Sequence, residues 1–344
     1  MFGPVRVLSL VFLGVFSAAP ALAQTPYNVE GARLLGFGDA QRALVNGNDA
    51  LYTNPAGIAL ANWYSVELGW LDDFEEGERR FNASIVDSHE KRLTGGVGYT
   101  YRRFRVQDLP DPQTEERGVA HRVDVSMASR MADGLAFGLT GRYLNVSHSI
   151  DDKDVPTASF GVFTFDAGLQ WRHPSGFAVG IAGYNLTANT RPEIPLAVGG
   201  GIAYGSEMVQ LELDVRHDTR TAKPRFSMGA SLLLGGTFVI RGGGAYDLAT
   251  QTGGLSVGIG VITPQFSADL GFRQSVKSGV AAPGFDTERI FALALRGVPF
   301  MERRRASFAG GPRPPTSRRS KRPPSSAARA WSRRSPLSPG APRS

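Results

Sequence analysis

The residue types that most often carry out catalysis are scarce in this sequence. It contains no Cys and five His. Ser147, His148 and Asp151 have the residue types of a nucleophile triad, but such triplets arise by chance in loops and a triad is defined by its geometry. The acidic run at 151–154 lacks the spaced ligand set of a calcium loop, and no His pair has the spacing of a zinc site. The sequence therefore predicts neither an enzyme nor a metal centre, and it indicates no cofactor.

Charged side chains instead recur at every second position of short segments. Glu212, Asp214 and Arg216 alternate with apolar residues, a period that is typical of a strand with one polar and one apolar face. From Trp63 onward we predict fourteen strands, near residues 63–71, 79–87, 93–104, 119–131, 134–146, 158–172, 176–185, 195–206, 208–217, 224–234, 236–246, 253–262, 264–273 and 288–298. His89, His148 and His173 are expected in the connections between them.

The connections between these strands distinguish a barrel from a periplasmic β-sandwich. Odd-numbered connections are mostly long, such as SHSIDDKDVPT, whereas even-numbered ones are short, such as ADG. Long loops on one side and tight turns on the other are typical of outer-membrane barrels, and closure removes the exposed edges of the sheet. We therefore predict an all-β fold, a transmembrane antiparallel β-barrel of about 14 strands over residues 62–300.

In such a barrel the polar face of each strand lines the lumen. The charged residues predicted to point inward are Glu67, Arg102, Arg122, Asp124, Arg142, Asp166, Glu212, Asp214, Arg216, Arg241 and Asp269. We expect these charges to pair across the lumen. The aromatic residues predicted to face lipid near the two membrane interfaces are Tyr64, Trp70, Tyr101, Tyr143, Trp171, Tyr204, Phe238 and Tyr246.

The N-terminus has the pattern of a secretory signal peptide. Arg6 precedes a short apolar run at 7–16, and Ala21 and Ala23 form the small-residue cleavage pattern. We predict that residues 1–23 are removed near Ala23, so that the mature chain is exported. No later segment has the run of about 20 apolar residues that a transmembrane helix needs.

The segment at 24–61, which precedes the barrel, does not alternate. Asn48 or Asp49 is expected to cap a short helix, and Pro55 biases Asn54 toward an extended or turn conformation. Its pattern is G-A-R-x-L-G-x-G-x-A followed by A-L-Y-x-N-P-A-G, at Gly31, Ala32, Arg33, Leu35, Gly36, Gly38, Ala40, Ala50, Leu51, Tyr52, Asn54, Pro55, Ala56 and Gly57. This pattern resembles the N-terminal region of the FadL/TodX superfamily of outer-membrane barrels, including its PorV-like branch.

The resemblance implies a fourteen-stranded barrel whose N-terminal segment folds into the lumen as a hatch. The residues that it assigns to the hatch are Gly36, Gly38, Asn54, Pro55, Ala56 and Gly57. Whether this segment is a gate or an inert stopper stays open. The charged lumen and the short outer loops differ from the long apolar channel of a fatty-acid transporter.

The excess of positive charge belongs to the C-terminal segment. The chain has 38 basic and 31 acidic residues, but residues 302–344 hold 12 of the basic ones and a single acidic residue, Glu302. Residues 24–301 carry 25 basic and 30 acidic residues, which argues against binding of nucleic acid. Residues 301–344 are rich in Pro, Ser and Arg, and we expect them to form a disordered basic tail.

Two functions fit these observations. The first is an outer-membrane barrel for passive uptake of hydrophobic small molecules such as long-chain fatty acids, gated by the N-terminal plug. The second is a PorV-like barrel that anchors or shuttles secreted proteins and has no transport role. The expected partners are outer-membrane lipid together with a hydrophobic small molecule or, in the second case, secreted proteins.

Overall fold

A computed structural model describes residues 31–74, 77–89, 93–106, 116–150, 156–187, 194–219, 223–249, 251–277 and 289–297. The predicted signal peptide and the C-terminal tail lie outside the described residues. The helices are α1 (Ala32–Gly36) and the 3₁₀ helices η1 (Gly47–Leu51) and η2 (Pro55–Leu60). The strands are β1 (Tyr64–Asp73), β2 (Glu78–Asp87), β3 (Thr94–Val106), β4 (Glu116–Ala132), β5 (Leu135–Ile150), β6 (Pro156–Arg172), β7 (Phe177–Tyr184), β8 (Ala197–Gly205), β9 (Val209–Asp218), β10 (Arg225–Leu234), β11 (Phe238–Asp247), β12 (Thr252–Ile262), β13 (Phe266–Lys277) and β14 (Arg289–Gly297).

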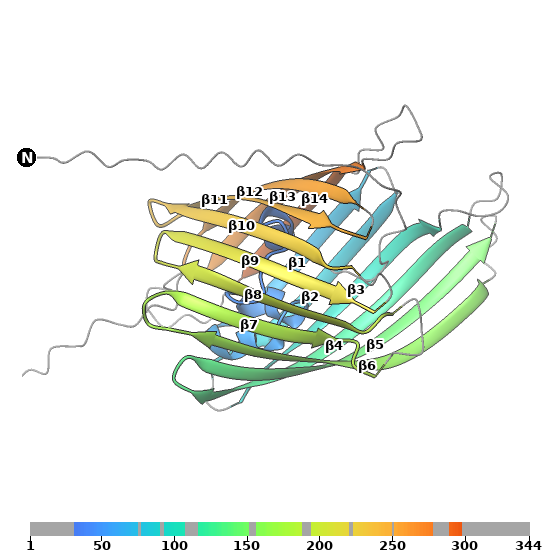
Figure 1. Cartoon of the computed structure of the whole chain (residues 1–344). Coiled ribbons are helices and arrows are strands. Elements are labelled where there is room, and N and C mark those ends of the chain that lie inside the picture. The colour runs from blue at the N-terminus through green and yellow to red at the C-terminus, as the bar shows by residue number, and fades with distance from the viewer. Residues whose placement is uncertain are drawn as a thin grey trace, which may run out of the picture. The chain divides into compact units, whose positions relative to one another are not determined.

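The fourteen strands form one closed antiparallel barrel, as the alternation and the connections predicted (Figure 1). Each strand pairs with its neighbours in the chain, and β1 closes the ring against β14 with Val66 opposite Gly297 and Asp73 opposite Ile290. Closure satisfies the backbone hydrogen bonds of every strand, which a bilayer requires of a strand-based span. Among the described residues, no helix has the length and hydropathy that would carry it across a bilayer.

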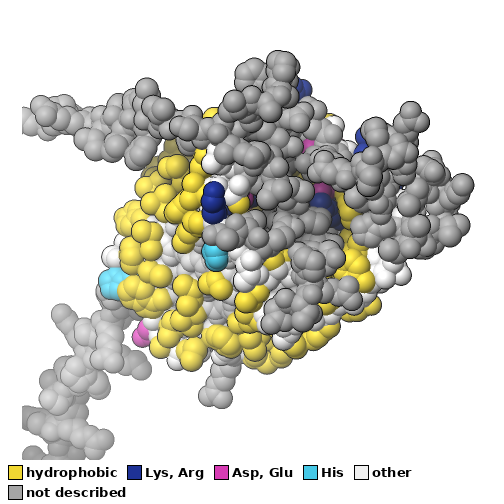
Figure 2. Space-filling view, turned by 45° about the vertical axis from the view of Figure 1, so that its right-hand side comes forward, with side chains coloured by type: hydrophobic (Ala, Val, Ile, Leu, Met, Phe, Trp, Pro, Cys, Tyr) yellow, Lys and Arg dark blue, Asp and Glu magenta, His cyan; other side chains and the backbone are white. Residues whose placement is uncertain are grey.

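The outer surface of the barrel is apolar. Hydrophobic side chains gather on it in the space-filling view (Figure 2), and Leu213, Met228 and Val257 are 54%, 55% and 59% exposed. On the same strands the alternate side chains are buried inside, among them Glu212 and Asp214 of β9. This arrangement places hydrocarbon outside the barrel and charge inside it.

The barrel wall is taller on one side than the sequence predicted. β4, β5 and β6 have 17, 16 and 17 residues, whereas β7 and β8 have 8 and 9. A transmembrane strand needs about 9–11 residues, so β4–β6 are longer than a membrane span requires, and Figure 1 shows them as long strands on one side of the barrel. His148, predicted in a connection, therefore lies in β5. On the inner face of these strands Ala120, Leu144 and Val146 belong to a buried apolar cluster. The predicted end of β5 at residue 146 falls short of its observed end at Ile150.

Leu213→Arg should prevent stable insertion of the barrel. The Leu213 side chain lies near the middle of β9 on the apolar face, where a cation costs about 2–4 kcal/mol at the bilayer midplane. The folded band on a heat-modifiability gel should be reduced or lost. Glu207→Arg is the matched control, because Glu207 is exposed in the turn before β9. Normal insertion of the Leu213→Arg variant would contradict the assignment of this face to lipid.

Candidate functional site

The N-terminal segment lies inside the barrel and crosses the lumen. α1 packs against β11–β14 and β1, η1 against β1–β4, and η2 against β3–β6. Two apolar clusters hold its ends. Ala32 and Leu35 of α1 pack with Leu71, Ile290 and Ala292 of the wall, and Leu51 and Ile58 belong to a second cluster with Val86, Ala128 and Ala136. We use the name hatch for the described residues 31–61.

Asn54 connects two parts of the hatch with each other and with the wall. Its side-chain amide donates to the carbonyl of Arg42 at 2.8 Å and to that of Leu169 in β6 at 3.2 Å. Its side-chain oxygen accepts from the Ala56 amide at 3.2 Å, so Asn54 caps η2, with Pro55 in the first turn. The proposed caps Asn48 and Asp49 were wrong, since the residue before η1 is Asn46. Asn48 donates to Ser84 instead.

Glycines of the wall allow the hatch to approach the strands closely. A Cβ at Gly138 of β5 would lie 2.5 Å from the amide nitrogen of Ala56, and one at Gly168 of β6 would collide with Asn54. Within the hatch, Gly38 has a positive φ of 68°, and a Cβ there would lie 2.6 Å from the carbonyl oxygen of Met228. Gly36 likewise lies against the backbone of Gly258. Side chains at these positions would hold the hatch away from the wall.

The backbone at 42–44 is held by one carboxylate of the wall. Glu212 of β9 accepts hydrogen bonds from the backbone amides of Arg42 at 2.6 Å and Leu44 at 3.2 Å, and also from that of Ala43. The Arg42 guanidinium donates to Asp214 at 2.8 Å. On the other side, Arg172 of β6 donates to the carbonyls of Leu44 and Val45, each at 2.8 Å. Ala43 also packs against Ala178 and Ala203 of the wall, so polar contacts and a small apolar cluster together hold this part of the hatch.

Two further ionic clusters, around Arg33 and around Asp39, join the hatch to the strands. Arg33 pairs with Asp49 at 2.7 Å and with Glu67 of β1 at 3.1 Å, and Arg296 of β14 also pairs with Glu67. Asp39 pairs with Arg225 and Arg273, each at 2.6 Å. Burial alone would raise the pKa of the Asp39 carboxyl, but Arg273 and Arg225 outweigh that effect and hold its pKa below the usual range. Asp39 is therefore ionised at neutral pH.

The charged residues predicted to point inward do lie on the inner face. They are buried, apart from the half-buried Arg216. Instead of pairing across an open lumen, they pair along the wall or with the hatch. Arg142 bridges Asp124 and Asp166 over β4–β6, Arg122 pairs with Asp124 at 2.7 Å, Arg241 pairs with Asp269 at 2.7 Å, and Arg102 pairs with Glu78.

Sequence reasoning missed the charged residues of the hatch itself. Arg33, Asp39 and Arg42 pair with charged residues of the wall, and Asp49 pairs with Arg33. Each of the four is buried or nearly so. These residues could have been predicted, because buried charges on the inner wall need partners of opposite charge, and a segment that fills the lumen has to supply them. The alternation predicted the inward direction of Glu212, but it contained no information about the three amides that Glu212 accepts from.

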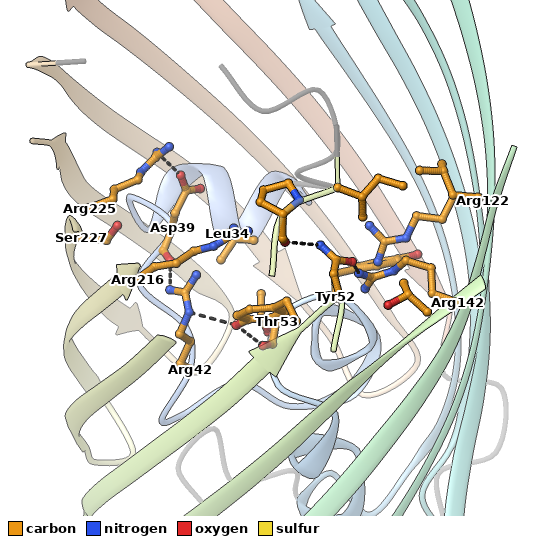
Figure 3. A pocket seen from close by; sticks show the side chains of 16 residues that line it. Leu34, Asp39, Arg42, Tyr52, Thr53, Arg122, Arg142, Arg216, Arg225 and Ser227 are labelled. Atoms are coloured by element: carbon orange, nitrogen blue, oxygen red, sulfur yellow. Dashed lines mark hydrogen bonds and ion pairs between the residues drawn. The ribbon is translucent and has the colours of Figure 1, made fainter. Parts of the chain in front are cut away.

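Two hollows lie on opposite sides of the residues at 39–46. The outer chamber, on the side of the long connections, is lined by Leu34, Tyr52, Arg122, Arg142, Tyr184 and Arg216, among others (Figure 3). The inner chamber, on the side of the tight turns, is lined by Gln41, Leu44, Asn46, Trp63, Pro264 and Phe266, among others. They hold about 930 Å³ and about 970 Å³ of space, part of which opens to solvent.

The outer chamber combines guanidinium groups with aromatic and aliphatic side chains. Arg42 and Arg216 lie over the ring of Tyr184 at 5.9 and 5.0 Å from its centroid, and Arg122 lies 5.5 Å from that of Tyr52. Leu144, Ile194 and Pro195 complete an apolar side. Figure 3 shows arginines on both sides of the chamber. Such a lining is suited to a molecule that is apolar over most of its surface and negatively charged at one end.

Comparisons with known proteins agree with the fold. No protein-family model and no curated protein match the chain. Among solved structures, the CymD monoaromatic hydrocarbon channel has a TM-score of 0.64 at 13% identity and covers 80% of this chain and 98% of its own. A Pseudomonas aeruginosa FadL homologue has a TM-score of 0.62 at 10% identity, with coverage of 81% and 100%. The Ralstonia pickettii toluene transporter TbuX has a TM-score of 0.61 at 12% identity, with coverage of 79% and 98%.

Identities this low establish similarity of architecture alone. The matches nevertheless extend over nearly the full length of each of these proteins, and the strand number agrees with the one that the N-terminal motif implied. The chain therefore has the fold of the FadL/TodX superfamily of barrel channels, as its N-terminal pattern predicted.

Proposed function

We propose that this protein is an outer-membrane channel for passive uptake of hydrophobic small molecules that carry an anionic group, a class that includes long-chain fatty acids. The shared fold supports a channel, since the matched structures are named for hydrocarbon and toluene transport. The observation that carries the substrate class is the outer chamber, where Arg42, Arg122 and Arg216 lie over aromatic rings beside an apolar side.

We place the gate at residues 39–46. This segment separates the outer chamber from the inner one, and its contacts with Glu212, Asp214 and Arg172 are polar. Polar contacts can exchange with water or with a ligand, whereas apolar contacts have to expose buried surface in order to move. The apolar contacts of 39–46 are small, with Ala43 against Ala178 and Ala203 and Val45 against the cluster at η2. A shift of 39–46 alone would join the two chambers.

In this mechanism the segment from Asn54 to Gly57 acts as a fixed support. A substrate carboxylate that enters the outer chamber competes with Asp214 for the Arg42 guanidinium, which also contacts Tyr184 at 3.0 Å. Loss of the Arg42 to Asp214 contact weakens the hold on 42–44, and the substrate then passes to the inner chamber and the periplasm. Gly36 and Gly38 keep α1 against the wall while this occurs.

Arg216→Gln should lower uptake of a labelled long-chain fatty acid but leave uptake of labelled toluene unchanged. A hydrogen bond to a charged group contributes about 1.5–3 kcal/mol, so the apparent affinity for the fatty acid should fall by roughly tenfold or more. Lys223→Gln is the matched control, because Lys223 is an exposed cation in the described part of the next connection.

Three outcomes separate the alternatives. Equal loss of both uptakes would contradict an anion-specific chamber. If fatty-acid uptake is the same with and without the protein, and the protein instead retains secreted proteins from the same cell, the PorV-like interaction barrel replaces the channel. Recovery of the wild-type protein in the soluble periplasmic fraction would contradict the outer-membrane location.

A further inference from the structure

We propose that the outside of β2–β4 binds the phosphorylated headgroup of an outer-leaflet glycolipid. This inference rests on the outer-membrane location and does not depend on transport through the lumen. It concerns four arginines that point away from the barrel interior and that neither the hatch nor the chambers use, namely Arg79, Arg103, Arg105 and Arg117.

An aromatic row lies on the lipid side of this part of the wall. The strand register places Trp70 opposite Phe81, Phe81 opposite Tyr101, and Tyr101 opposite His121. The His121 ring also stacks on Tyr99, whose hydroxyl lies 2.9 Å from its Nδ1. Aromatic side chains with a polar group concentrate where hydrocarbon gives way to headgroups, so this row indicates the level of the outer membrane interface.

The arginines begin one step further outward on the same strands. Arg79 and Arg103 follow the aromatic row and lie directly opposite each other, and Arg105 lies opposite Arg117. A phosphate can contact both members of such a pair, because guanidinium groups bind it with two parallel hydrogen bonds.

These arginines surround a hollow rather than a flat surface. The hollow lies at the outer ends of β1–β4 and contains about 860 Å³ of space, part of which opens to solvent. Its charged lining among the described residues is Asp72, Asp73, Arg79, Arg103, Arg105 and Arg117. Asp72 pairs with Arg79 at 3.3 Å, and Asp73 is buried.

A lipid headgroup fits this position better than a free anion. Below the aromatic row the same strands present an apolar surface, with Val97, Val125 and Met127 each about half exposed. A glycolipid whose acyl chains lie on that surface brings its phosphates to the height of the arginines, and basic residues at an interface attract anionic headgroups. Inorganic phosphate would have only the arginines as a contact.

The test is native mass spectrometry of the full-length protein in detergent. The probes are bisphosphorylated lipid A, the same lipid after removal of both phosphates, and inorganic phosphate. We expect lipid A to bind at least about tenfold more tightly than the dephosphorylated form, and the double variant Arg103→Ser, Arg105→Ser to lose this preference. Lys223→Ser should keep it.

Two results with the wild-type protein would overturn the proposal. Equal binding of the two lipids would show that the arginines do not recognise phosphate, and phosphate binding as tight as lipid A would indicate a free-anion site. If the double variant does not fold, as judged by heat modifiability, the comparison of the two lipids on the wild-type protein still decides. Fatty-acid uptake should be unchanged in the folded variant, so failure here is separate from failure of the proposed channel.

Discussion

Glu212→Gln is expected to make the barrel permeable to polar solutes without unfolding it. The carboxylate accepts hydrogen bonds from three consecutive backbone amides of the hatch, those of Arg42, Ala43 and Leu44. An amide side chain has one acceptor oxygen and presents its own N–H groups to the remaining donors. Each buried donor that loses its partner costs about 1–3 kcal/mol, and about 1.4 kcal/mol already raises the population of a loosened hatch tenfold.

The measurement is uptake of a polar antibiotic by cells that produce the variant, which should increase by at least about tenfold. Glu207→Gln removes the same charge from the exposed turn before β9 and should have no effect. The heat-modifiable folded band should remain in both, because the strand pairing of β9 does not involve these side chains. A sealed barrel in the Glu212→Gln variant would show that the residues at 39–46 are held by their other contacts and that the gate lies elsewhere.

Gly138→Ala should displace η2 from the wall. The added Cβ would lie 2.5 Å from the Ala56 amide nitrogen, and the atoms that it meets belong to the backbone of Pro55 and Ala56, which cannot rotate away. Since η2 is confined by the apolar cluster around Ile58, the whole segment has to shift. Overpacking of this kind costs about 1–3 kcal/mol, and we expect faster proteolytic cleavage within the hatch together with a leak of polar antibiotic.

Gly141→Ala provides the matched control on the same strand. Gly141 points outward, and a Cβ there would lie 3.4 Å from the Phe163 ring, which is within ordinary contact distance. Both variants should show the folded band, because alanine is tolerated in strand pairing. If the two variants resist protease equally, Gly138 is not needed for close approach of the hatch, and the position of η2 against β5 would have to be revised.

These two variants also distinguish the two regions in which the hatch is attached to the wall. Glu212→Gln acts on the segment at 39–46, which we identify with the gate, whereas Gly138→Ala acts on the support at Asn54 to Gly57. If the protein is a channel, Glu212→Gln should change the rate of fatty-acid uptake, whereas Gly138→Ala should only loosen the hatch. Equal effects on uptake would mean that the hatch moves as one body.

The sequence by itself determined the barrel. Side chains alternate strictly across a strand, and a bilayer demands an apolar exterior and a closed ring of hydrogen bonds. Glu212 and Leu213 therefore had to face opposite sides, and the tight and long connections had to alternate. For the same reason fourteen strands and the inward direction of the charged residues followed from pattern alone, and the N-terminal motif added the expectation of a hatch.

The tertiary structure alone decided what those inward charges do. Arg42 and Glu212 are 170 positions apart, and they meet only because the ring closes around the hatch. Neither residue carries a local signal for the other, since the pairing depends on the stagger of the strands and on how deep the hatch lies. The full length of β5 was likewise decided by the structure, because the strand continues from the predicted end at residue 146 to Ile150 through its pairing with β4 and β6. Alternation tells which way a side chain points, and closure of the barrel determines what it meets.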